Sequence, residues 1–86
     1  MTTYQVLKKY GWRQRFMGST DTGFCLLGAF LHAHPRARAA GAGSKLRALA
    51  KAAGCRNLSA CEIVQWNDET GRTKKAVLAV AKNSGV

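Results

Sequence analysis

The chain has 86 residues, 47% of them hydrophobic, and its 14 Lys and Arg against four Asp and Glu give a formal net charge of +10. This length predicts one domain, because two separate cores would each be too small to be stable. The longest apolar stretch, 24–31, is too short to cross a bilayer, and the N-terminus lacks the basic and apolar regions of a signal peptide. Three cysteines are too few for a disulfide framework, so we expect a cytoplasmic protein.

The first third of the chain predicts a short helix followed by a turn. Val6, Leu7 and Tyr10 share one face of a helix that Thr2 or Thr3 caps and that ends at Gly11. Residues 12–17 show neither a clean helical nor a clean strand pattern, whereas 18–23 favour a turn. Two interpretations of this segment therefore remain: a small hairpin that pairs 13–17 with 22–25, or an irregular loop.

The apolar stretch that follows predicts a buried central helix from Gly23 or Phe24 to about Ala33, capped by Asp21 or Thr22. Gly28 costs this helix about 1 kcal/mol relative to alanine, and we expect the close approach of a neighbouring helix to offset the cost. Pro35 ends the helix. The residues after it, 35–43, are rich in Ala, Gly and Arg and predict a flexible connector.

The second half of the chain predicts three helices, each opened by a capping hydroxyl: Ser44 to Ala53, Ser59 to about Trp66, and Thr73 to about Asn83. Ser59 and Glu62 match the capping-box pattern. Asn67 to Arg72 is predicted to be a turn in which Asn67 or Asp68 bonds to the backbone. Trp66 falls on the inward face of its helix, which predicts a core position, with a surface anchor for a partner as the alternative.

Together these elements predict a mainly α fold over residues 1–86. It is a small compact bundle of four to five short helices, with or without a β-hairpin near residues 13–25.

Several short islands carry a resemblance to a known family. They are Gly11-Trp12, Cys25-Leu26-Leu27-Gly28-Ala29, Ile63-Val64-Gln65-Trp66-Asn67-Asp68, and Thr73 with Val77. In these the chain resembles a family of short uncharacterised proteins from actinobacteria and their phages. The resemblance implies a bacterial or phage-encoded cytoplasmic protein with a compact fold, in which the Trp-Asn-Asp turn lies near a buried tryptophan. It implies no catalytic residues.

The positive charge is concentrated in the middle of the chain. Residues 25–58 hold six basic residues and no acid, whereas 59–86 hold four basic residues against three acids. A surface that serves only solubility mixes both signs, and Lys or Arg placed on phosphates releases counterions, so we expect binding to DNA or RNA. The residues expected to bind are Arg36, Arg38, Lys45, Arg47, Lys51 and Arg56, extended by Arg13, Arg15 and Lys75.

Two alternatives remain for the partner and for the last two helices. The partner of the basic surface is either nucleic acid or an acidic surface of a host protein that this chain regulates or inhibits. The last two helices form either a helix–turn–helix or an ordinary packed pair. Asp68 and Glu69 in the turn would be repelled by phosphate, and only Thr73 offers a short polar side chain near the start of the last helix, which favours the packed pair.

The sequence offers no pattern typical of catalysis or metal binding. Cys25, His32, His34, Cys55 and Cys61 lack the usual spacings of zinc ligands. There is no paired carboxylate, phosphate-binding loop or nucleophile turn. The prediction is a non-enzymatic binding protein without metal or cofactor.

Overall fold

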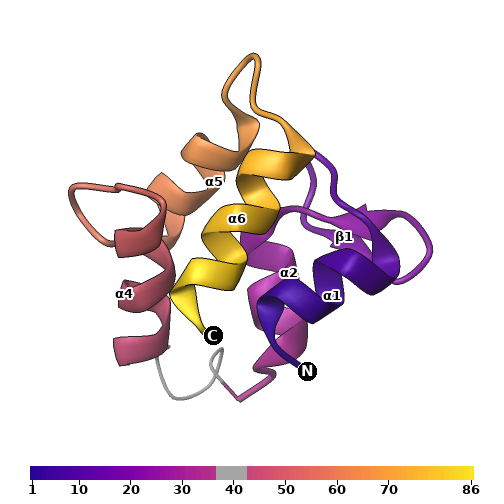
Figure 1. Cartoon of the computed structure of the whole chain (residues 1–86), viewed down its shortest axis with the longest axis horizontal. Coiled ribbons are helices and arrows are strands. Elements are labelled where there is room, and N and C mark those ends of the chain that lie inside the picture. The colour runs from indigo at the N-terminus through magenta and orange to yellow at the C-terminus, as the bar shows by residue number, and fades with distance from the viewer. Residues whose placement is uncertain (37–42) are drawn as a thin grey trace.

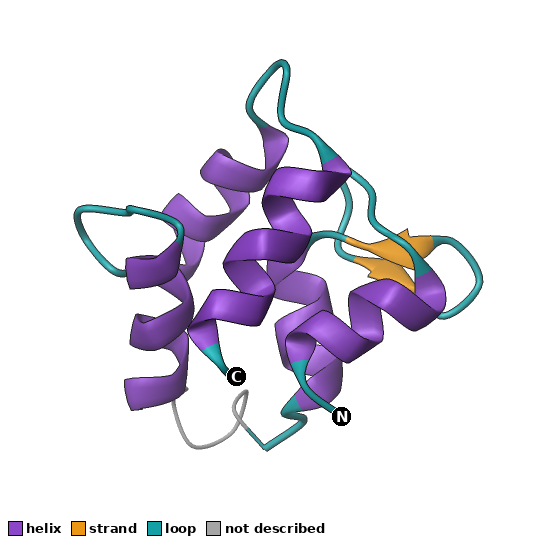
Figure 2. Ribbon diagram, viewed as in Figure 1, coloured by secondary structure: helices purple, strands orange, loops and turns teal. Residues whose placement is uncertain are grey.

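The computed structural model describes residues 1–36 and 43–86, and Figures 1 and 2 show their arrangement. The elements are α1 (Thr3–Tyr10), β1 (Gly18–Ser19), β2 (Gly23–Phe24), α2 (Leu26–Ala33), α4 (Gly43–Ala52), α5 (Ala60–Asp68) and α6 (Lys74–Ser84). The predicted mainly α fold is confirmed, and the hairpin is present. Its second strand lies within the predicted 22–25, but its first strand is Gly18–Ser19, in the segment predicted to be the turn, and not 13–17. Gly18 lies opposite Phe24 and Ser19 opposite Gly23 in an antiparallel pair. Most of the predicted connector 35–43 lies outside the described residues.

Helices α1 and α6 begin and end where their capping residues predict. The Thr2 hydroxyl accepts a hydrogen bond from the Gln5 amide at 3.2 Å, and the Gln5 side chain accepts one from the Thr2 amide at 2.9 Å, a complete capping box. The Thr73 hydroxyl caps α6 by accepting a hydrogen bond from the Ala76 amide at 3.2 Å. A glycine with positive φ follows each helix and lets the chain turn away.

Helix α2 begins later than predicted, at Leu26, and Cys25 is its cap instead of Asp21 or Thr22. The Cys25 sulfur accepts a hydrogen bond from the Gly28 amide at 3.2 Å. Phe24 pairs with β1, and its amide also donates to the carbonyl of Gly11 at 2.9 Å. The helix begins two residues after Phe24, although Phe24 continues its apolar pattern, because the backbone of Phe24 is already used in these strand contacts.

Gly28 is needed for a close approach, but the neighbour is not the helix we expected. A Cβ atom at this position would lie 2.1 Å from the carbonyl oxygen of Met17, which is far inside van der Waals contact. Met17 precedes β1, and its carbonyl accepts a hydrogen bond from Cys25 at 3.2 Å. Gly28 therefore lets the hairpin lie directly on α2.

Helix α5 begins as predicted but continues further, through Asp68, so Asn67 lies inside the helix and not in a turn. Ser59 caps it by accepting from the Glu62 amide at 3.3 Å. The Glu62 carboxylate bonds to Asn57 and not to the Ser59 amide, so the predicted capping box is only half formed. Helix α4 starts one residue before Ser44, which therefore is not its cap.

The core is enclosed by the helices, which pack against one another in pairs. Helix α2 packs against α1 and α5, while α6 packs against α4 and α1. Figure 1 shows α6 between α4 and α1, with α2 behind α1. The largest fully buried apolar side chains come from each of the helices that the structure describes: Val6, Leu7, Leu26, Phe30, Leu49, Ile63 and Val77. Trp66, predicted to be in the core, is only half-buried and packs at its edge. No helix among the described residues has the length and apolar character to span a membrane.

Candidate nucleic-acid interface

Three neighbouring helices carry basic residues and no acid. Helices α4 and α1 flank α6, as Figure 1 shows, and none of the three contains Asp or Glu. Their eight basic residues are all exposed: Lys8, Lys9, Lys45, Arg47, Lys51, Lys74, Lys75 and Lys82. We call these residues the basic layer. Three helices side by side concentrate positive charge more strongly than one helix does alone.

The acidic residues lie elsewhere and are mostly engaged. Asp21 lies in the exposed hairpin turn, and the other three belong to α5 or directly follow it. Glu62 bonds to Asn57, Asp68 accepts from the Arg15 amide at 2.8 Å, and Glu69 pairs with Arg72 at 2.5 Å. Within residues 1–36 and 43–86, Arg72–Glu69 is the single ion pair, so the basic layer keeps its full charge.

Helix α4 carries three of the predicted binding residues, Lys45, Arg47 and Lys51, and all three are exposed. Arg47 and Lys51 lie away from Leu49, which packs into the core, whereas Lys45 is exposed in the first turn of the helix. Arg47 and Lys51 are one helical turn apart and therefore neighbours on the surface. The predicted binding residue Lys75 belongs to α6, which packs directly against α4.

The remaining predicted residues of the middle third are less well placed. Arg56 is exposed after α4, but it lines a groove of about 400 Å³ together with the acids Glu62 and Glu69. Arg36 is exposed after the end of α2. Arg38 lies outside the described residues.

Arg13 and Arg15 lie apart from α4, which carries three of the other predicted binding residues. They belong to the loop between α1 and the hairpin, and Figure 1 shows the hairpin and α4 at opposite sides of the molecule. The Arg13 guanidinium covers the Phe16 ring, with its central carbon 4.7 Å from the ring centroid. Arg15 is exposed and has a positive φ of 74°.

Four residues of the basic layer were missed from the sequence: Lys8, Lys9, Lys74 and Lys82. The Lys82 ammonium lies 5.9 Å from the centre of the Tyr4 ring, which joins the exposed surfaces of α6 and α1. A count of charge by thirds of the chain hides Lys74 and Lys82, because the acids of α5 fall in the same third as α6; Lys8 and Lys9 fall in the first third, which holds only four basic residues against one acid. A count by predicted helix would have found them.

The loop that carries Arg13 and Arg15 is fastened to the end of α5 by Asn67, which is fully buried. The Asn67 side-chain oxygen accepts from the indole of Trp12 at 2.6 Å and from the amide of Leu26 at 3.0 Å, and its nitrogen donates to the Arg13 carbonyl at 3.2 Å. Asn67 thus connects three segments that are distant in the sequence. The predicted local role of Asn67 in a turn is wrong.

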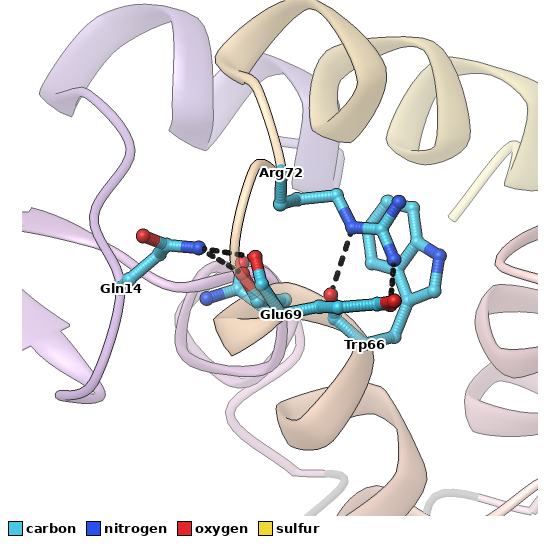
Figure 3. Close-up of polar contacts among 5 residues, drawn as sticks. Gln14, Trp66, Glu69 and Arg72 are labelled. Atoms are coloured by element: carbon cyan, nitrogen blue, oxygen red, sulfur yellow. Dashed lines mark hydrogen bonds and ion pairs between the residues drawn. The ribbon is translucent and has the colours of Figure 1, made fainter.

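Figure 3 shows two further contacts at this end of α5. Gln14 donates to the backbone oxygens of Asn67 and Glu69 at 3.0 and 3.1 Å. Arg72 lies over the Trp66 ring at 4.0 Å from its centroid and donates to the Trp66 carbonyl at 2.8 Å. Trp66 therefore serves to hold the chain between α5 and α6, with one face of its indole covered.

The structure does not support the helix–turn–helix alternative, nor the packed pair that we favoured over it. In a helix–turn–helix the second helix is held in place by the first. Here α5 packs against α2 and α4, whereas α6 packs against α4 and α1, and the two successive helices make little contact with each other.

The cysteines and histidines make no cluster in the described part of the chain. No group of three His, Cys, Asp or Glu side chains there is placed to hold a metal ion. Burial raises the pKa of the Cys25 thiol. It also raises the pKa of the Cys55 thiol, which is only half-buried. The His32 ring packs against Tyr10 and Phe24, and His34 hydrogen-bonds to the Val86 carbonyl oxygen. These histidines have structural contacts.

Comparison with known proteins identifies the family but not the activity. Residues 2–83 match the model of a family of unknown function, DUF6197, and the chain belongs to this family. No curated protein matches the chain. No solved structure matches it either.

Proposed function

We propose that this protein is a non-enzymatic binding protein that docks on nucleic acid through phosphate contacts made by the basic layer. The observation that carries the proposal is the set of eight exposed Lys and Arg on α4, α6 and α1, with no acid on any of the three helices. A surface of this kind gains affinity by releasing counterions from the phosphate backbone. The proposal includes the origin that the sequence resemblance implies, a cytoplasmic protein of actinobacteria or their phages.

The dimensions of the molecule suit such binding. Its longest extent is 26 Å, which corresponds to roughly seven or eight base pairs of duplex. The basic layer holds seven Lys and one Arg, and Lys is a flexible point charge without the planar fork by which Arg discriminates a base edge. We therefore expect weak sequence preference.

The test is a titration of labelled mixed-sequence DNA and RNA by fluorescence anisotropy at increasing salt. If about six phosphates are contacted, affinity falls by a factor on the order of 1,000 between 50 and 200 mM salt. Absence of binding to both nucleic acids at about 50 mM salt, where electrostatic binding is strong, refutes the proposal.

A pair of variants separates the basic layer from net charge alone. Ala79 is exposed on α6 within the layer, and Gln65 is exposed on α5 outside it. Ala79→Glu and Gln65→Glu lower the net charge equally, so a specific layer predicts that only Ala79→Glu weakens binding several-fold. Equal weakening by both variants means that the layer is not the site.

The second candidate is a regulator that binds an acidic host protein, and the same basic layer favours it. Capture of partners from bacterial lysate after nuclease treatment distinguishes the two. A protein partner remains bound after the treatment, whereas anything bridged by nucleic acid is lost.

A further inference from the structure

Phe16 and Met17 form an unusual exposed apolar pair. Phe16 is 63% exposed and Met17 is 38% exposed, while every other Phe, Tyr and Trp side chain is buried or half-buried. Exposing an aromatic ring gives up its burial energy, and exposed aromatic residues beside arginine are typical of binding surfaces. The pair therefore requires an explanation other than packing.

The loop that presents these side chains is held in a fixed shape. Asn67 binds Trp12 and Arg13, Gln14 binds the end of α5, and the Arg15 amide donates to Asp68. Arg15 has a φ of 74°, a conformation that costs energy for any residue with a side chain. Such strain persists where surrounding contacts impose it, and it concentrates at functional sites. Here the strained residue comes between Gln14, bonded to α5, and the exposed Phe16.

The surroundings of Phe16 are positively charged. The Arg13 guanidinium covers the ring at 4.7 Å from its centroid, and Arg15 is exposed next to it. Of the two acids near the loop, Glu69 is paired with Arg72, whereas Asp68 accepts only from the neutral amides of Arg15 and Asn67 and keeps its charge, so two arginines stand against one uncompensated carboxylate. The loop also begins at the end of α1 that carries Lys8 and Lys9, so it adjoins the basic layer.

We infer that Phe16 stacks on an unpaired base of single-stranded DNA or RNA while Arg13 and Arg15 contact the adjacent phosphates. A base is a flat apolar ring that a duplex keeps inside its stack, so a stacking platform selects single strands. Aromatic rings interleaved with basic side chains are the usual means of binding single strands without sequence preference. This inference rests on the proposed function, because the basic layer supplies the general attraction to phosphate, and it adds a preference for unpaired bases.

The test compares a single strand of about 12 nucleotides with a blunt duplex of similar length. Phe16→Ala is expected to weaken binding of the single strand at least roughly fivefold and to leave duplex binding within about twofold. Phe16→Trp keeps a stacking face and retains single-strand binding. Phe16→Leu keeps apolar area without a π face and behaves like Phe16→Ala.

The outcomes separate this inference from the proposed function. If both nucleic acids bind, and Phe16→Ala leaves the single strand unaffected or weakens both equally, the stacking inference is wrong while the basic layer stands. If Phe16→Leu binds the single strand as well as the unmodified protein does, the ring serves as an apolar contact and not as a stacking platform. If neither nucleic acid binds at low salt, both proposals fail. Phe16 is exposed, so its variants are expected to fold, which circular dichroism checks.

Discussion

Asn67 is the residue whose removal most sharply tests how the fold is held together. Asn67→Ala deletes two acceptor bonds, from the Trp12 indole and the Leu26 amide, and two donor bonds, to the Arg13 carbonyl and Asp68. Leu26 is the first residue of α2, so its amide has no partner within the helix. Each buried donor left without an acceptor costs about 1–3 kcal/mol, so we expect a loss of about 3 kcal/mol or more.

This loss is large compared with the total stability. A chain of this length has an unfolding free energy of about 4–13 kcal/mol, and 3 kcal/mol corresponds to a fall in Tm of roughly 12–24 °C. Urea denaturation followed by circular dichroism measures the change. Asn83→Ala is the matched control, because Asn83 is exposed near the end of α6, and we expect it to change stability by less than about 0.5 kcal/mol.

A double-mutant cycle with Trp12→Phe tests the bond itself. Trp12→Phe removes the indole donor, so the combined variant should be more stable than the sum of the two single effects predicts, by about 0.5–3 kcal/mol. If Asn67→Ala costs less than about 1 kcal/mol, or if the two changes are additive, Asn67 does not hold the N-terminal loop on α5 and the reasoning fails.

Two further variants and one labelling experiment test other contacts. Gly28→Ala places a methyl group against the Met17 carbonyl and should lower Tm in a thermal melt, although alanine favours helix; an unchanged or higher Tm would contradict the close approach. Arg72→Ala removes the stack on Trp66 and the bond to its carbonyl, and should lower the unfolding free energy by about 1–3 kcal/mol in urea denaturation. Little of this loss comes from the pair with the exposed Glu69. A loss below about 0.5 kcal/mol would refute the role of Arg72 in holding the chain between α5 and α6. Burial raises the pKa of the Cys25 thiol, so a thiol reagent should label exposed Cys61 first; equal labelling rates by mass spectrometry would disprove the burial. The sign of the pH effect follows, because the stability contributed by neutral Cys25 is complete below the unfolded thiol's pKa and is lost as pH rises through the raised value.

The helix ends that sequence predicts correctly are those set by local contacts. Thr2, Ser59 and Thr73 cap helices by accepting from the amide three residues later, so the pattern is visible within four positions. The start of α2 was predicted wrongly because the deciding contact is not local. Phe24 pairs with β1 and with Gly11, and its apolar character alone cannot distinguish a strand from a helix.

Asn67 shows why the anchor of the fold was not predicted. Its bonding partners Trp12 and Arg13 lie more than 50 positions away in the sequence, and Leu26 lies 41 positions away. An asparagine before a stretch of polar residues has the pattern of a turn, and turns are its commonest local role. Only the packing of α5 against α2 turns its amide into the core.

The placement of charge depends on tertiary structure in the same way. Along the chain, the acids of α5 cancel most of the basic residues of α6, and the C-terminal third is almost neutral. In space, α5 packs against α2 and α4 while α6 lies between α4 and α1, so the cancelling charges belong to different helices. Helix α6 consequently contributes Lys74, Lys75 and Lys82 to a layer that the sequence assigned mainly to residues 25–58. Electrostatic attraction depends on distance in space and is screened beyond about 10 Å, so the charge of each helix face, and not of each stretch of sequence, determines where an anionic partner binds.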